Sequence, residues 1–171
     1  MDLRLLGSMA ALQEDPTVFQ IGTAGRYGDE AFELVGRVQR RWSGGVWNEW
    51  HMCFGGGRSG WLAEAQGLLM VSFRVPEPPP SERSMQLGQR FEFRSHSYMV
   101  HDIKEVLASY AEGELPVVTE QGSTVRSIDL TGPGSLFACA SFSDGGAELY
   151  LGEYRDFDSF HFQRVREFDG W

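Results

Sequence analysis

The stretch FELVGRVQRRWSGGVWNEWHMCFGGGRSGWLAEAQG, residues 32–67, decides the fold of this chain. It holds four of the five tryptophans among apolar residues that alternate with polar ones, and two glycine-rich segments divide it. Such alternation is typical of half-buried β-strands, and short glycine-rich segments between the runs predict hairpins. We therefore expect antiparallel strands over 32–38 and 46–54 joined by a tight turn at 43–45. A third strand should begin at Trp61 after a turn over 55–60.

Along the first of these strands, simple alternation puts Phe32, Leu34, Gly36 and Val38 on one face. Residues 68–75 predict a fourth strand. Consecutive prolines over 76–84 predict a semi-rigid extended connector, because proline lacks a backbone donor and has a fixed φ. In the second half, strands are expected over 90–94, 98–102, 124–130, 136–142, 148–155 and 161–167. Apolar spacing over 103–111 predicts one or two helical turns, and 156–160 predicts another short turn.

The two halves of the chain show related patterns. Trp61-Leu62-Ala63-Glu64 is echoed by Tyr150-Leu151-Gly152-Glu153, and other apolar and glycine positions recur in the same order. We therefore expect a first β lobe over 1–75, the connector over 76–84, and a second β lobe over 85–171 that repeats the first. The expected fold class is mainly β. It consists of two similar small antiparallel lobes, each a rolled sheet or barrel-like, with one or two short helices.

Composition limits the function classes. The 171 residues carry a formal net charge of -9 with only 15 Lys+Arg, which argues against a nucleic-acid partner and against docking on anionic lipid. No segment approaches the roughly 20 apolar residues that span a bilayer, and the N-terminal stretch lacks the pattern of a signal peptide. Cys53 and Cys139 lie far apart among apolar neighbours, as free thiols in a reducing compartment do. We expect a cytoplasmic protein with no membrane insertion.

Candidate ligand-binding residues gather on the second strand. Trp47, Glu49 and His51 alternate along one face of it, and Glu64 on the third strand is expected opposite them. A carboxylate beside an imidazole can support acid–base chemistry or form part of a metal site. The alternative is a cross-strand polar pair covered by an aromatic ring. No second histidine lies nearby in sequence, so we predict no metal site. Trp61 and Glu114 complete the predicted ligand-binding set.

Motifs of common enzymes are missing from the sequence. Gly55-x-Gly57-x-x-Gly60 has the spacing of a dinucleotide fingerprint, but the residues before Gly67 are too few for the helix which that chemistry needs. The chain has no nucleophile elbow, no phosphate-binding loop with lysine and no helical pair of metal-binding histidines. We therefore predict no catalytic residue and no cofactor.

Several blocks of the sequence resemble a bacterial family, the domain of unknown function numbered 4178. The resemblance runs from about residue 16 onward, and it rests on these blocks: Gly36-Arg37-Val38, Trp47-Asn48-Glu49-Trp50, residues 61–67, Gly113-Glu114-Leu115-Pro116, Asp129-Leu130, Phe137-Ala138 and residues 150–153. It implies a gene neighbourhood with polyamine-synthesis enzymes and small membrane proteins. Some relatives carry a cysteine-rich metal-binding segment ahead of the domain, and the residues before the resemblance in this chain show no such segment. The family supplies no catalytic residues.

The sequence is consistent with two functions from different classes. The first is a non-catalytic binding or scaffolding module that acts with a protein partner, because aromatic residues such as Trp47, Tyr154 and Trp171 are expected on polar faces. The second is a sensor or small enzyme whose carboxylate, histidine and tryptophan pocket takes a small cation, with a polyamine as first candidate. Self-association through open strand edges is a third alternative. Convergence of Glu49, His51, Glu64 and Glu114 around one concavity separates the second function from the first.

Overall fold

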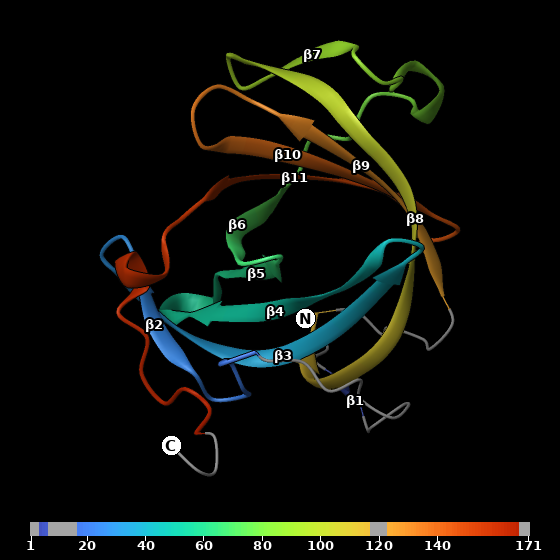
Figure 1. Cartoon of the computed structure of the whole chain (residues 1–171). Coiled ribbons are helices and arrows are strands. Elements are labelled where there is room, and N and C mark those ends of the chain that lie inside the picture. Colours follow the sequence, from blue (N-terminus) through green and yellow to red (C-terminus); the bar gives the residue numbers. More distant parts are fainter. Residues whose placement is uncertain (1–3, 7–16, 117–122, 168–171) are drawn as a thin grey trace.

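The computed structural model describes residues 4–6, 17–116 and 123–167 (Figure 1). Its strands form one antiparallel sheet: β1 (Arg4–Leu6), β2 (Ala24–Tyr27), β3 (Glu30–Trp42), β4 (Gly45–Phe54), β5 (Ser59–Ala65), β6 (Leu68–Val75), β7 (Arg90–Phe93), β8 (His96–Leu115), β9 (Thr124–Thr131), β10 (Leu136–Ser143) and β11 (Gly146–Tyr154). Helical structure in the described part is limited to three 3₁₀ turns: η1 (Gly55–Gly57), η2 (Glu82–Ser84) and η3 (Phe157–Phe160).

Eight of the strands close into a barrel, which confirms the mainly β, barrel-like fold class. They follow the order β3-β4-β5-β6-β11-β10-β9-β8, and β8 returns to pair with β3. Closure depends on the length of β8, which has 20 residues: its first part pairs with β9 and its last part with β3. β2 extends the sheet beyond β3, whereas β1 and β7 pair with β8.

The two halves of the chain supply neighbouring sets of barrel strands. β3–β6 precede the proline-rich connector and β8–β11 follow it, and the sets join at the β6–β11 and β3–β8 pairings. In Figure 1 β3 and β4 form the lower wall of the barrel and β9–β11 the upper wall, with β5 and β6 between them. The repeat relation between the halves stays a prediction.

The predictions for hairpins and strands that pair with sequence neighbours are confirmed. The β3–β4 hairpin turns directly after the Trp42↔Gly45 pair, and β6 covers residues 68–75 as expected. The short turn over 156–160 is confirmed as η3. The helical turns expected over 103–111 are wrong, because these residues lie in β8 and pair with β9 and then with β3. The strand expected over 161–167 is also wrong, since only an isolated Ala24↔Gln163 bridge forms there.

A β-bulge at Val35 changes which residues of β3 share a face. Leu34 pairs with Met52, but Gly36 pairs with His51, so the register shifts by one residue between them. The expectation that Val38 continues the face of Leu34 is therefore wrong, because a single extra residue reverses every later side chain.

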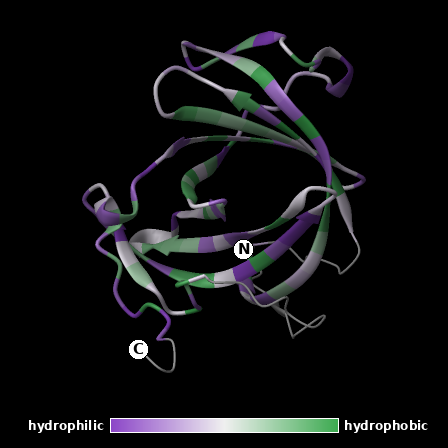
Figure 2. Ribbon diagram, viewed as in Figure 1, coloured by the Kyte–Doolittle hydropathy of each residue, from purple (hydrophilic) through white to green (hydrophobic). Residues whose placement is uncertain are grey.

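The apolar side chains of the sheet gather in two main clusters on opposite walls. The first surrounds Trp50 and Met52 and is covered by Phe19 and Phe160 from segments that flank the barrel strands. The second surrounds Ile128 and Leu130 and is covered by Met85 and β7. Figure 2 shows hydrophilic and hydrophobic residues following one another along the same barrel strands. These two clusters occupy one face of the sheet, and a third, smaller cluster of Val38, Ala108, Ala111 and Leu115 packs against Trp61 on the other face.

Candidate ligand-binding site

The side chains of β4 alternate between the outside and the inside of the barrel. Trp50 and Met52 belong to the outer cluster, so Glu49 points the other way. Burial raises the pKa of the Cys139 thiol, and the charges of Asp129 and Glu49 add to this. Cys139 lies on β10, which three strands separate from β4 in either direction around the barrel. Side chains on opposite walls interact in this way only across the interior, so Glu49 and Cys139 both point inward.

The pairing registers extend this inward face around the barrel. It carries charged, polar and aromatic side chains, which include Arg40, Trp42, Trp47, Glu49, His51, Trp61, Arg74, Asp102, Lys104, Ser127, Asp129, Phe137, Cys139, Glu148, Tyr150 and Tyr154. All except His51 are at least partly exposed. The same inward face also carries buried apolar residues, which are Val38, Val106, Ala108 and Ala111, and outward Trp50, Met52 and Leu62 are fully buried. An eight-stranded barrel has room either for its own side chains or for one small ligand. Partial exposure of the inward residues indicates an interior that solvent reaches.

Lys104 on β8 lies at the centre of a charged group on this inward face. Its Nζ is 3.1 Å from Oδ2 of Asp102 and 3.3 Å from Oδ2 of Asp129. The same Nζ lies 5.2 Å from the ring centre of Trp42 and 5.1 Å from that of Trp47. Burial acts to lower the pKa of Lys104, but the two carboxylates outweigh it and the pKa is raised. The ammonium therefore stays charged at neutral pH.

Glu49 lies beside this group and fixes one of its aromatic rings. Oε2 of Glu49 accepts from Nε of Arg40 at 3.1 Å, and its Oε1 accepts from the indole Nε1 of Trp47 at 3.2 Å. A ring that donates to a paired carboxylate has little freedom to turn. Trp47 is thus held in place as a wall of the Lys104 group.

The opposite wall holds groups that stay protonated. Cys139 Sγ lies 3.4 Å from Oγ of Ser127. The hydroxyl of Tyr150 donates to Oε2 of Glu148, and burial followed by this hydrogen bond raises the pKa of Tyr150. Since the thiolate is the reactive form of cysteine, the raised pKa of Cys139 leaves an unreactive thiol there. This wall offers hydrogen-bonding groups to a ligand and no activated nucleophile.

His51 occupies the inward face two residues beyond Glu49. Its Nδ1 lies 3.0 Å from the carbonyl oxygen of Glu114. A carbonyl can only accept, so this contact assigns the proton to Nδ1 and leaves Nε2 as an acceptor. Nε2 is buried and has no hydrogen-bond partner in the described part of the chain. Burial lowers the pKa of His51, which keeps the ring neutral.

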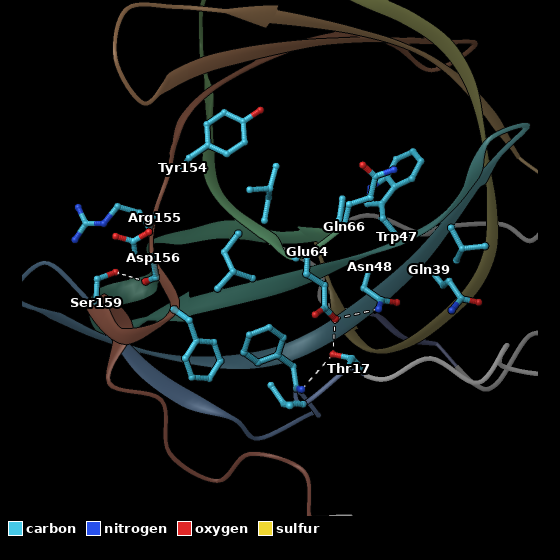
Figure 3. A pocket seen from close by; sticks show the side chains of 18 of the residues that line it. Thr17, Gln39, Trp47, Asn48, Glu64, Gln66, Tyr154, Arg155, Asp156 and Ser159 are labelled. Atoms are coloured by element: carbon cyan, nitrogen blue, oxygen red, sulfur yellow. Dashed lines mark hydrogen bonds between the residues drawn. The ribbon is translucent and has the colours of Figure 1, made fainter.

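A pocket of about 970 Å³ opens beside the β5–β6 hairpin (Figure 3). Trp47 and Tyr154 line it from the inward faces of β4 and β11, and Thr17 and Asn48 line it from the outer side. Glu64 lies between these two sides. Its Oε1 accepts from Thr17 Oγ1, from Asn48 Nδ2 at 3.0 Å and from Trp50 Nε1 at 3.1 Å. We call this opening the mouth pocket, because it exposes inward residues at one end of the barrel.

The structure brings four of the six predicted ligand-binding residues onto one face, since Trp47, Glu49, His51 and Trp61 all point inward. The expectation that Glu64 shares their face is wrong. Glu64 pairs with Asn48, and directly opposite residues of a sheet point to the same side, so Glu64 reaches the mouth pocket from outside. The side chain of Glu114 is exposed, and only its carbonyl meets His51. Trp171 lies outside the described residues.

Sequence reasoning missed the residues that complete the inward face. Lys104 lies in the segment for which the apolar spacing predicts helical turns, and Asp102 and Asp129 face it only once β8 and β9 pair. One signal was present in the sequence, since Lys104 is the sole lysine among 15 Lys+Arg.

No group of three or more histidine, cysteine, aspartate or glutamate residues is arranged to hold a metal ion within residues 4–6, 17–116 and 123–167. The same residues contain no helix with the length and apolar character that crossing a bilayer requires.

Comparison with known proteins places the barrel in a family. No curated protein and no solved structure matches the chain. A family model with the description Domain of unknown function (DUF4178) matches residues 20–157, which include all eight barrel strands. The match covers most of the chain and confirms the resemblance drawn from the tryptophan-rich blocks. This chain therefore belongs to the family described as Domain of unknown function (DUF4178).

Proposed function

We propose that the protein is a binding barrel for a small organic cation, which enters at the mouth pocket and is held on the inward face. One observation carries the proposal: the interior holds charged and aromatic side chains that are partly exposed, whereas the two larger apolar clusters lie outside and only the small cluster around Val38 lies inside. An eight-stranded barrel either fills its interior with its own side chains or holds one small ligand, and partial exposure of the inward side chains favours the second case.

The charge of the interior favours a cation. The inward residues named above include four carboxylates, on Glu49, Asp102, Asp129 and Glu148, and three cationic side chains, on Arg40, Arg74 and Lys104. An excess of negative charge in a partly enclosed space attracts cations and raises their local concentration.

Aromatic rings supply the second part of the recognition. Trp42 and Trp47 already lie within cation–π distance of an ammonium, that of Lys104, and Tyr154 lines the mouth pocket. Such contacts contribute about 0.5–2 kcal/mol each. A linear amine such as spermidine fits these features, since it combines several ammonium groups with a slender apolar chain. The gene neighbourhood implied by the family resemblance also makes a polyamine the first ligand to test.

Calorimetric titration and thermal unfolding with spermidine, putrescine and the uncharged 1,4-butanediol test the proposal. A ligand at a hundred times its Kd should stabilise the fold by about 2.7 kcal/mol. Glu49→Gln should weaken amine binding, because it removes an inward carboxylate. Glu105→Gln is the matched control, since Glu105 is an exposed residue on β8 beside inward Lys104 and faces outward. Absence of a saturable response to any amine, or an equal loss in both variants, would contradict the proposal.

A protein partner remains the second candidate function, and one observation favours it. Leu68 and Phe157 are 54% and 46% exposed, and both line the mouth pocket. A protein that covers the mouth would bury both side chains. If so, Leu68→Ser and Phe157→Ser should abolish affinity capture of that protein from native extract, while Leu87→Ser, at another exposed leucine, should not.

A further inference from the structure

We infer that the group around Lys104 is the ammonium-binding site of the barrel, with Lys104 as an internal occupant that the ammonium of a ligand replaces. The inference rests on the proposed function and deepens it by naming the place of the ligand's charge. The site consists of Trp42, Trp47, Asp102 and Asp129 around the Nζ of Lys104.

The geometry of this site suits any ammonium group. Two rings lie 5.2 and 5.1 Å from the nitrogen, inside the distance of about 6 Å at which cation–π attraction is effective. Two carboxylates lie 3.1 and 3.3 Å away and accept its N–H groups. These four contacts are all made to Nζ and involve no atom of the lysine backbone. A primary ammonium would meet the same partners, whereas a quaternary one has no N–H to donate and would be held by the rings and by the charges of the two carboxylates.

The choice of lysine at this position is informative. Every other cationic side chain among the 15 Lys+Arg is an arginine, and Lys104 is the sole lysine. A guanidinium is planar and pairs with a carboxylate through a fork of donors, whereas an ammonium is a compact point charge. The site is therefore shaped for a compact ammonium, which is the chemistry we assign to the ligand.

The Lys104 site is open to solvent. The side chain of Lys104 is 19% exposed, and those of Asp102 and Asp129 are 40% and 29% exposed, so solvent reaches all three. Trp47 forms one wall of the site and also lines the mouth pocket. A ligand that enters at the mouth thus meets the site at this ring.

An independent feature of the interior also favours a nitrogen-bearing ligand. Nε2 of His51 is a buried acceptor with no partner among the described residues, and it belongs to the same inward strand face as Trp47. A buried acceptor such as Nε2 is stabilised by a hydrogen-bond donor, which an amine supplies and an anion does not.

The tethered ammonium of Lys104 competes with any ligand, because an attached group has an effective concentration on the order of millimolar. Removing it should therefore tighten binding, which is opposite to the usual effect of deleting a residue from a binding site. We expect Lys104→Met, which keeps an unbranched side chain without the charge, to bind n-butylammonium at least about tenfold more tightly than wild type.

The experiment compares wild type, Lys104→Met, Lys104→Met/Asp129→Asn and Arg126→Met by calorimetric titration with n-butylammonium chloride at constant ionic strength. The double variant should lose the gain, because it lacks a carboxylate of the site. Arg126→Met is the matched control, since it removes an exposed cation that faces outward on β9. The inference is overturned if Lys104→Met binds no tighter than wild type or if Arg126→Met tightens binding equally.

A second measurement uses the wild-type protein, in case Lys104→Met does not fold. Because Lys104 is the sole lysine, its acetylation by an amine-reactive ester can be followed by mass spectrometry, with the N-terminal amine as internal reference. Addition of n-butyltrimethylammonium, which cannot be acetylated, should displace Lys104 and accelerate its acetylation severalfold. Slower or unchanged acetylation would overturn the inference. If wild type binds spermidine but neither measurement gives the expected result, the proposed function stands and only this site is wrong. If no amine binds any variant, the proposed function and the inference are both wrong.

Discussion

Substitutions at neighbouring positions on β5 and β6 should report which side of the sheet holds the apolar core. Leu62 on β5 points outward and is fully buried in the first cluster. Truncation to alanine removes three carbon atoms, worth about 2.4 kcal/mol at about 0.8 kcal/mol per buried group. The cavity left in a close-packed cluster adds to this, so we expect Leu62→Ala to cost about 3 kcal/mol.

The comparison residue is Met70 on β6, which points inward and is partly exposed. Solvent already reaches this side chain, so its truncation leaves no dry cavity. We expect Met70→Ala to cost about 1 kcal/mol or less, although methionine is the longer side chain. Urea unfolding followed by circular dichroism gives both free energies of unfolding, provided that the m-values agree. A cost for Met70→Ala equal to that for Leu62→Ala would refute the assignment of a solvent-reached interior.

Three further outcomes follow from single contacts. Folding lowers the pKa of His51, so below about pH 6.5 the unfolded chain binds a proton at this ring more readily than the folded chain does. The free energy of unfolding should therefore decrease as the pH falls below this value. In His51→Gln, the free energy of unfolding measured against pH should decrease less steeply. A Cβ at Gly36 would lie 2.0 Å from a β8 carbonyl oxygen, so Gly36→Ala should lower the free energy of unfolding by about 3 kcal/mol. Gly55→Ala should leave it unchanged, because a Cβ at Gly55 would lie in open space. Trp50→Phe removes a 3.1 Å hydrogen bond to Glu64 and should cost roughly 1 kcal/mol or more by urea unfolding.

The sequence predicted the features of the fold that depend on neighbouring residues. The β3–β4 hairpin and β6 follow directly from alternation and glycine turns. Alternation separates the two faces of a strand but does not say which face lies inside a closed barrel. Here the face with Trp50 and Met52 lies outside under covering segments. That outcome depends on closure between strands far apart in the chain, which a local pattern does not contain.

The error over 103–111 has a specific physical cause. Bulges interrupt β8 near Asp102, opposite β9, and near Ser109, opposite β3. Between the bulges both faces of the strand carry apolar residues, with Val106 inward and Ile103 and Leu107 outward, and the bulge at Ser109 adds Tyr110 to the outward face. The spacing of these four residues therefore imitates that of a helix. The same error concealed Lys104, whose partners come from β3, β4, β8 and β9. The site residues on β4 were found because they follow one another along a single strand.

The two pairings that join the halves of the barrel have a consequence for folding kinetics. Each four-stranded set forms from hairpins between sequence neighbours, but β6–β11 and β3–β8 unite residues as distant as Val75 with Leu149 and Gly36 with Gly113. Non-local pairings are slow to form because the chain entropy lost in closing long loops precedes the gain from contacts. The half-formed barrel would meanwhile expose unpaired strand edges. Stopped-flow refolding should accordingly be slower than for helical proteins of this length, with productive yield falling as protein concentration rises.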